Sequence, residues 1–417
     1  MASPVDFSDK GVAAATPASV QALASTAAIR EATQIFARDK KWIDEQHLAL
    51  CRIPAPTFFE QRRAEWMAAQ FQDAGCETRI DRAGNVIAFP VRERDGPLIA
   101  LTAHLDTVLS PRTPDEIRVS PEGVFEGPGV SDNGAGLAAL LAIARAFRST
   151  PALADRAAGL VLAANVGEEG EGNLSGMRYL CRNSGLASRV RAWVVLDGPD
   201  TSHITCQALG SRRFEVTFTG PGGHSWSDFG IPNPVQALSR ALTLFADNRP
   251  NGGPRYSFNV GTIEGGVGIN SIPTEASAKL DLRAETAARI DEMVEALNAA
   301  VEKAAETENR QAATGRVAAR IREVGSRPAG SLPPDSALLT CLRLVDAHLA
   351  IRSHLDCAST DANIPLSLGM PALSLGAGGQ GGGAHSRNEW FRPAGRPLGL
   401  SRIFLLLCLL LDDLSSQ

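Results

Sequence analysis

The chain has 417 residues, 44% of them apolar, and a formal net charge of -5. This length and composition allow two or more domains with hydrophobic cores, and they exclude a disordered or fibrous protein. The acidic balance argues against a general affinity for nucleic acid or for an anionic membrane, so we expect a small substrate and neither of those partners. Seven cysteines without a Cys-x-x-Cys pair indicate reduced thiols, as in a cytoplasmic protein.

The two ends of the chain carry no clear targeting or membrane signal. Residues 1–25 are rich in Ala, Ser and Pro but lack a basic start and a continuous apolar stretch, so we expect a frayed N-terminal extension. Residues 403–411 form the most apolar run, but a run of this length spans only about half a bilayer. We expect this run to be a buried C-terminal helix.

Predicted helices and strands alternate along the first part of the chain, which we assign to residues 26–210. Helical periodicity extends from about residue 27 to residue 76, with a break at Pro54–Pro56. A turn at residues 83–85 then leads into the first strand.

The apolar run Leu98–Thr107 reads as a buried strand that delivers two polar side chains at its end. Because alternate side chains of a strand point to one face, His104 and Asp106 emerge side by side, where open α/β sheets place their sites. This geometry suits a metal ligand and the carboxylate that orients it. For this motif alone, a solvated loop histidine is the plainer alternative.

A glycine-rich bend, Gly127–Gly136, brings Asp132 to the start of the helix that follows. An aspartate in this position is often only a helix N-cap, and that alternative stays open. A phosphate-binding loop is disfavoured, because the bend has neither of the glycine patterns, GxxxxGK and GxGxxG, that such loops use.

Two further apolar strands lead into carboxylates. The strand at residues 159–166 is followed by Glu168 and Glu169, and the strand that begins at Trp193 is followed by Asp197. Acidic runs are usually solvated, but carboxylates that come directly after core strands fit a surface poorly.

A change of pattern near residue 210 indicates an inserted domain, which we assign to residues 211–326. Its strands alternate polar and apolar residues, as half-exposed strands do, whereas the earlier strands are apolar throughout. The predicted order is strand, helix, strand, strand, helix, strand, which is that of a ferredoxin-like α+β sandwich. The first pattern then returns, so residues 327–417 form the second part of the first domain.

The last predicted strand, near residues 370–375, is followed by a glycine-rich run that ends at His385. So many glycines let the backbone approach a site closely. A flexible linker is the alternative, but a linker would need neither this histidine nor Glu389, which follows four residues later.

The groups at these strand ends are imidazoles and carboxylates, which zinc, cobalt and manganese accept as ligands: His104, Asp106, Asp132, Glu168, Glu169, Asp197 and His385. Two histidines and three carboxylates are enough for two metal ions if one carboxylate bridges them, and one acid then remains to carry protons. No local motif such as HExxH occurs, so spacing alone is not decisive.

In this order, and divided by an inserted sandwich domain, these residues resemble the aminoacylase/carboxypeptidase-type di-zinc peptidase family from about residue 40 onward. The resemblance implies an α/β zinc-peptidase-type catalytic domain whose mainly parallel central sheet is flanked by helices. It implies that the inserted domain is a ferredoxin-like lid through which two chains form a homodimer.

The resemblance also implies a role for each group. Five residues would bind two divalent ions, zinc or else cobalt or manganese: His104, Asp132, Glu169, Asp197 and His385. Asp132 would bridge the ions, with His104 and Asp197 on one and Glu169 and His385 on the other. Asp106 would orient His104. Glu168 would be the general base that takes a proton from a water between the metals and hands it to the leaving amine.

Three motifs of the inserted domain resemble functional motifs of the same family. They would supply a lid histidine, His224, an asparagine loop with Asn270, and a substrate-binding arginine, Arg327. His224 would act as an electrophile across the dimer. Each motif could equally be a turn or a surface charge. The chain departs from the family at Asn133, where many members have lysine, and at Trp226, where small residues are usual.

Several functions remain open at this point. The first is hydrolysis of short free peptides by an aminopeptidase, dipeptidase or tripeptidase, because family members with aspartate at the position of Asp197, such as peptidase T, tend to have this activity. An N-acyl amino acid deacylase or a carboxypeptidase of the same family is the alternative, and such members tend to have glutamate there. A metal-free or single-metal binding protein would lack a ligand, whereas all five ligand positions and Glu168 are intact.

Overall fold

The structure, a computed structural model, describes residues 15–249 and 252–415. The chain divides into two compact units. The main unit comprises residues 1–208 and 331–417, and the inserted unit comprises residues 209–330. The inserted unit extends beyond the predicted limits of 211–326, since its last strand continues to Arg327.

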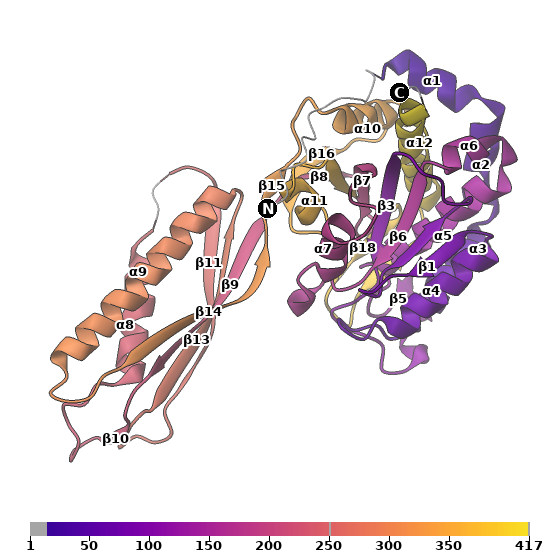
Figure 1. Ribbon diagram of the computed structural model, residues 1–417. Helices are drawn as coiled ribbons and strands as arrows, with labels where there is room; N and C mark the ends of the chain where they lie inside the picture. Colours follow the sequence, from indigo (N-terminus) through magenta and orange to yellow (C-terminus); the bar gives the residue numbers. More distant parts are fainter. Residues whose placement is uncertain (1–14, 250–251, 416–417) are drawn as a thin grey trace. The chain divides into compact units, whose positions relative to one another are not determined.

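A nine-stranded sheet forms the centre of the main unit (Figure 1). Its strands lie in the order β1 (Glu77–Ile80), β2 (Val86–Phe89), β6 (Leu160–Asn165), β3 (Leu98–His104), β7 (Val190–Leu196), β17 (Ala372–Leu375), β8 (His203–Ala208) and β15 (Gly330–Ser331), and β16 (His354–Ala358) also pairs with β8. Strands β6, β3, β7 and β17 are parallel, whereas β1, β2 and β8 pair antiparallel with neighbours on this path. The central strands β3 and β6 are buried along their whole length, as strands covered on both faces are.

Helices flank this sheet (Figure 1). They are α1 (Pro17–Ser25), α2 (Ala27–Arg38), α3 (Lys40–Cys51), α4 (Gln61–Asp73), α5 (Gly134–Ser149), α6 (Ala154–Ala157), α7 (Ser175–Arg182), α10 (Ala337–His348), α11 (Asn363–Ser367) and α12 (Arg396–Ser415). Helix α12 contains the apolar run 403–411, all of which is buried, so the prediction of a buried C-terminal helix is confirmed.

The N-terminal extension was predicted to be frayed, and for residues 17–25 this prediction is wrong. These residues form α1, which begins with a capping box between Thr16 and Ser19. Val20 and Leu23 on α1 are buried in the hydrophobic core of the main unit. Residues 1–14 lie outside the described residues.

The inserted unit is a four-stranded antiparallel sheet with two helices on one face (Figure 1). Its elements are β9 (Gly210–Thr219), β10 (Gly223–His224), α8 (Pro234–Asp247), β11 (Tyr256–Gly265), β12 (Ser271–Ile272), β13 (Glu275–Ala284), α9 (Ala287–Gln311) and β14 (Ala318–Arg327). The sheet order is β11-β13-β9-β14, and the short strands β10 and β12 pair separately. Apart from those short strands, the chain order matches the predicted ferredoxin-like pattern.

A second small sheet of the main unit has no counterpart in the predictions. It consists of β4 (Arg118–Val119), β5 (Phe125–Glu126), β18 (Gln380–Gly382) and β19 (Trp390–Arg392). Strand β19 pairs with β5, which places Glu389 beside Gly127 at the start of the glycine-rich bend. Strands of two or three residues are too short to show a periodicity in the sequence.

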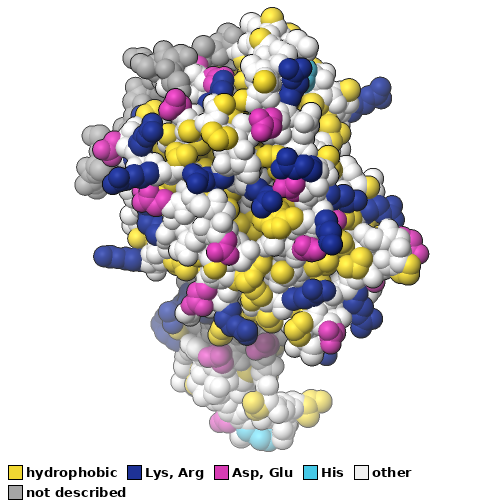
Figure 2. Space-filling view, turned by 90° about the vertical axis from the view of Figure 1, so that its right-hand side faces the viewer, with side chains coloured by type: hydrophobic (Ala, Val, Ile, Leu, Met, Phe, Trp, Pro, Cys, Tyr) yellow, Lys and Arg dark blue, Asp and Glu magenta, His cyan; other side chains and the backbone are white. Residues whose placement is uncertain are grey.

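The described residues include all seven cysteines, and no disulfide joins any two of them. No single helix of residues 15–249 and 252–415 has both the length and the apolar character to cross a membrane, although the bent pair of residues 134–149 and 151–157 has them by length and composition alone. Basic and acidic side chains are interspersed on the face shown in Figure 2.

Candidate metal centre

The candidate site lies where the parallel strands of the main unit end. His104 is the last residue of β3, Asp197 directly follows β7, and Glu168 and Glu169 come shortly after β6. The run after β17 leads to His385. Because parallel strands end at the same edge of a sheet, these segments converge, as ligand-binding segments of open α/β sheets do.

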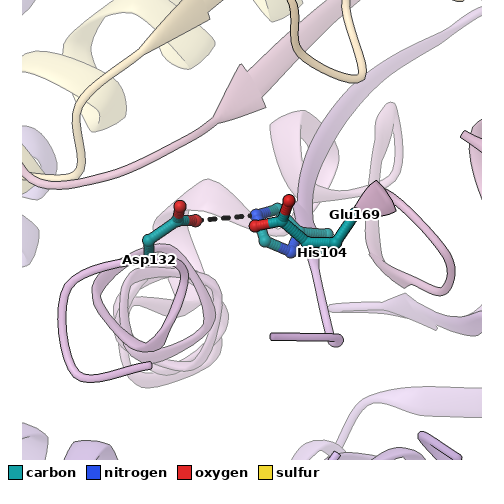
Figure 3. A group of neighbouring side chains, drawn as sticks. All are labelled: His104, Asp132 and Glu169. Carbon is teal, nitrogen blue, oxygen red and sulfur yellow. Dashed lines mark hydrogen bonds and ion pairs between the residues drawn. The ribbon is translucent and has the colours of Figure 1, made fainter. Parts of the chain in front are cut away.

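Three side chains form the centre of this cluster, and they point toward one another (Figure 3). The potential ligand atoms of His104, Asp132 and Glu169 all lie within 4.8 Å of one another. His104 and Glu169 are buried, and Asp132 is partly buried. An imidazole and two carboxylates at this separation can share one divalent cation.

Asp132 lies between two histidines. Its Oδ1 atom is 3.0 Å from Nε2 of His104, and its Oδ2 atom is 3.1 Å from Nε2 of His385. Nε2 of His385 is also 2.9 Å from Oε1 of Glu169. Each oxygen of the Asp132 carboxylate thus faces a different histidine, which is the arrangement that a carboxylate bridging two ions requires.

The adjacent residue, Asn133, explains why Asp132 is available for this role. Asn133 is the N-cap of α5, and its side-chain oxygen accepts a hydrogen bond from the N–H of Gly136 at 3.2 Å. Its amide nitrogen donates to the backbone oxygen of Leu196 at 2.8 Å. The N-cap alternative for Asp132 is therefore wrong. This chain thus has a buried amide at position 133 that joins α5 to β7.

Asp106 contacts both the candidate ligand His104 and the segment that carries Glu168 and Glu169. Nδ1 of His104 lies 2.9 Å from the backbone oxygen of Asp106 and 3.6 Å from its Oδ1 atom. The N–H groups of Glu168 and Glu169 each donate to the Asp106 carboxylate at 2.9 Å. Burial alone would raise the pKa of Asp106, but His104 and these N–H groups outweigh it and hold the pKa below its ordinary value. Asp106 thus orients a candidate ligand through its backbone oxygen and fixes the backbone of both glutamates through its buried carboxylate.

Asp197 is the remaining ligand predicted for the first ion. Its N–H donates to the backbone oxygen of Leu375 at 3.0 Å, so β17 fixes its position beside β7. Burial and the negative charge of Asp132 raise the pKa of Asp197 to about 7, and Glu169 adds to this effect. The carboxylates of this cluster repel one another, and a cation would relieve that repulsion.

Comparisons with known proteins bear on the whole chain. A family model described as the peptidase dimerisation domain of M20 peptidases matches residues 208–309, and that of peptidase family M28 matches residues 85–214. Among solved structures, an aminopeptidase PepT from Bacillus cereus has a TM-score of 0.70 at 18% identity and covers 88% of this chain and 98% of its own. A tripeptidase from Staphylococcus aureus has a TM-score of 0.71 at 18% identity, and the match covers 89% of this chain and 98% of the tripeptidase. The predicted resemblance to the di-zinc peptidase family is confirmed.

Curated relatives of the M20 type match over shorter stretches. A peptidase M20 domain-containing protein from Sordaria macrospora is 28% identical over 217 residues, which are 48% of this chain and 47% of the relative. A succinyl-diaminopimelate desuccinylase from Ectopseudomonas mendocina is 24% identical over 274 residues, 61% of this chain and 70% of the relative. The chain thus spans about half the length of the first of these relatives. The predicted fold class, an α/β domain with an inserted lid domain, is confirmed.

In the inserted unit, two of the three predicted functional residues lie together. His224 is on β10 and pairs with Ser271 of β12, and the N–H of Ser225 donates to the backbone oxygen of Asn270 at 2.9 Å. Nδ1 of His224 accepts the N–H of Trp226 at 3.2 Å. Both His224 and Asn270 are exposed.

Arg327, the third of these residues, lies at the other end of the same sheet. It is the last residue of β14 and pairs with Ser211 near the start of β9, whereas His224 follows the far end of β9. Strand β9 has 10 residues, so about 30 Å separate the two ends. Within the inserted unit, Arg327 therefore does not join His224 and Asn270.

Some buried or partly buried polar residues that support the site were not predicted. Thr57 donates to Oδ2 of Asp106 at 3.0 Å, and Glu60 accepts the N–H of Gly167 at 3.1 Å, directly before Glu168. Glu389 accepts N–H groups from the loop that contains Asp132. The position of Glu389 four residues after His385 was the only signal for it in the sequence.

Proposed function

We propose that this protein is a metal-dependent hydrolase of peptide bonds that acts on short free peptides, as an aminopeptidase, dipeptidase or tripeptidase. The observation that carries this proposal is the Asp132 carboxylate, whose two oxygens face two different histidines at 3.0 and 3.1 Å. A structural ion pair would need only one histidine.

The donor set fits two divalent ions, which we propose to be zinc, with cobalt or manganese as alternatives. The ligands would be His104, Asp132, Glu169, Asp197 and His385. Imidazole nitrogen and carboxylate oxygen are the donors that catalytic zinc sites use. When bound, the ions would polarise the scissile carbonyl and acidify a water molecule.

The residues of the main unit would then perform the proton transfers. Glu168 is buried, and its backbone is fixed by the hydrogen bond from its N–H to Asp106. We assign it as the general base, which removes a proton from the attacking water and passes it to the leaving amine. Asp106 keeps the ring of His104 in one orientation throughout.

The inserted unit would supply the groups that bind the substrate. His224 could stabilise the oxyanion of the tetrahedral intermediate, acting across a homodimer, and Asn270 lies close enough to assist it. The guanidinium of Arg327 suits the carboxylate at the end of a peptide. The match to a peptidase dimerisation domain supports the dimer. Seven cysteines without a disulfide among the described residues support a reducing compartment, so we place the protein in the cytoplasm.

A second candidate function is deacylation of N-acyl amino acids, or carboxypeptidase activity. It is favoured by the sequence relative named succinyl-diaminopimelate desuccinylase. The likeness of the fold to PepT and to a tripeptidase supports the first candidate. Both candidates need the same metal centre and the same proton transfers, so they differ only in how the substrate is held.

A substrate screen tests the proposal. The protein loaded with Zn²⁺ or Co²⁺ is assayed on unblocked di- and tripeptides and on N-acyl amino acids, with metal-stripped protein as the control. We expect metal-dependent hydrolysis of free peptides. Faster cleavage of every N-acyl amino acid than of any free peptide would establish the second candidate. Equal activity without metal would contradict both.

A further inference from the structure

Glu389 is a buried carboxylate with no role in the proposed chemistry. It accepts hydrogen bonds from three residues of the loop that precedes α5. Its Oε1 atom accepts the N–H groups of Ser131 and Asp132, each at 2.7 Å, and its Oε2 atom accepts the N–H of Gly129, also at 2.7 Å. Each of these bonds is at the short end of the range for N–H···O hydrogen bonds, so this carboxylate holds the loop firmly.

The loop of residues 129–132, which is bound to this carboxylate, has little conformational freedom of its own. Gly129 has a φ of +78°, and a Cβ atom at this position would lie 2.6 Å from Cγ2 of Thr107. The loop therefore packs against the segment that follows β3, and only glycine fits there. The N–H groups can point at Glu389 because the backbone adopts this left-handed conformation.

Glu389 also belongs to the segment that carries His385. Strand β19 pairs with β5, and the N–H of Gly127 donates to the backbone oxygen of Glu389 at 2.9 Å. The segment that presents His385 is thus tied by main-chain and side-chain bonds to the loop that presents Asp132. These two side chains meet at 3.1 Å in the candidate metal centre.

We propose that Glu389 is a positioning residue, which sets the distance between the Asp132 carboxylate and His385 and thereby the affinity of the centre for metal. The inference rests on the proposed function, because it assumes that these two side chains bind metal. Outer groups that orient metal ligands typically contribute about 10- to 100-fold to metal affinity.

Glutamine at position 389 would break this arrangement with little change of volume. Three N–H groups share the two oxygens of Glu389, and an amide has only one oxygen. The NH2 group of glutamine would take the place of one carboxylate oxygen. It would then face either the N–H of Gly129 or the N–H groups of Ser131 and Asp132. The loop has to shift to avoid two donors in contact, and Asp132 shifts with it.

The test measures metal binding and folding separately. Zn²⁺ affinity is determined by competition with a chromophoric chelator for the parent protein, Glu389→Gln and a control. Thermal unfolding is measured in EDTA, where no metal contributes. The control is Glu308→Gln, the same substitution at another buried glutamate, which accepts the N–H of Asn233 at 3.0 Å within the inserted unit.

We expect Glu389→Gln to bind Zn²⁺ about 10- to 100-fold more weakly than the parent. Its unfolding temperature in EDTA should stay close to that of Glu308→Gln, whose Zn²⁺ affinity should equal that of the parent. Parent affinity in Glu389→Gln would overturn the inference, because the loop would then need no such anchor.

A second variant decides the outcome if Glu389→Gln does not fold. Glu389→Asp keeps the charge but withdraws the carboxylate by one methylene. Weakened Zn²⁺ binding in folded Glu389→Asp would support a positioning role, whereas parent affinity would leave only a role in folding and overturn the inference. A parent protein that binds no Zn²⁺ would overturn the proposed function itself, so the two failures can be told apart.

Discussion

The candidate metal centre of the main unit and the β10–β12 end of the inserted unit differ in how firmly their functional groups are held. In the centre, His104, Asp106, Glu168 and Glu169 are at most 6% exposed, and backbone bonds fix their positions. At the β10–β12 end, four apolar side chains are each at least 86% exposed: Trp226, Phe229, Val267 and Ile269. The exposed residues His224, at the end of β10, and Asn270, directly before β12, belong to the same two segments.

This difference separates what one unit can do alone from what needs another surface. A preorganised cluster of carboxylates and imidazoles can bind metal without further structural change. Exposed groups such as His224 become effective only when water is excluded around them. We therefore expect metal binding to depend on the main unit alone and turnover to depend on both units. The predictions below test this division, beginning with the largest effect.

The largest effect is expected from Asp132→Ala. Because one carboxylate serves both histidines, its removal should abolish binding at both metal positions together, and activity with it. Metal content after dialysis, measured by mass spectrometry, checks this. Asp155→Ala, at an exposed aspartate, is the control and should retain the metal content of the parent. Full activity with one tightly bound ion in Asp132→Ala would contradict a shared ligand.

The next effect is that of Glu168→Gln, which should lower kcat by about 10²- to 10⁴-fold while metal content stays that of the parent. The amide keeps the size of the side chain but cannot accept the proton. Glu171→Gln makes the same change at an exposed position nearby and should keep full activity. Loss of zinc from Glu168→Gln would mean that Glu168 binds metal and that its role and that of Glu169 are exchanged.

The sequence located the strand ends of the candidate site well, because several site residues directly follow an apolar run that reads as a buried strand. His104, Glu168, Glu169 and Asp197 were all found this way, and the parallel sheet then brings their strand ends together. The alternating strands of the inserted unit were equally readable, since a period of two is visible over ten residues in β9 and β13.

What could not be predicted depends on contacts between distant segments. Glu389 and Gly129 are 260 residues apart, and the sequence around Glu389 does not show that its side chain contacts the loop of Gly129. The strands β5 and β19 that bring them together have two and three residues, too few to show a pattern. The N-cap role of Asn133, rather than Asp132, depends on backbone geometry that composition does not reveal.

His224→Ala tests the role of the β10–β12 end of the inserted unit. Loss of one donor to the oxyanion should lower kcat by about 10²- to 10³-fold, with metal content unchanged, since His224 lies outside the main unit. His348→Ala, at an exposed histidine of the main unit, is the control and should have parent activity. Loss of metal from His224→Ala would contradict the division of roles between the units.

Subunit mixing shows whether His224 acts across the dimer. Heterodimers of His224→Ala with Glu168→Gln contain one centre that has both intact groups if the histidine comes from the partner. Activity should then recover to a substantial fraction of the parent level. Verified heterodimers without any recovery would place His224 and Glu168 of one catalytic centre in the same chain.

The smallest expected effect is a change in substrate preference. It shows whether the main unit alone determines which substrate is preferred. Asp197→Glu adds one methylene beside the proposed metal position and should reduce the room for a free amino group. We expect the ratio of kcat/KM for a free dipeptide to that for its N-acetylated form to fall about tenfold, the usual worth of one methylene in a pocket. Asp200→Glu, the same change at an exposed aspartate three residues later, should leave the ratio unchanged. An unchanged ratio in Asp197→Glu would move the choice of substrate to the inserted unit, where Trp226 is 86% exposed.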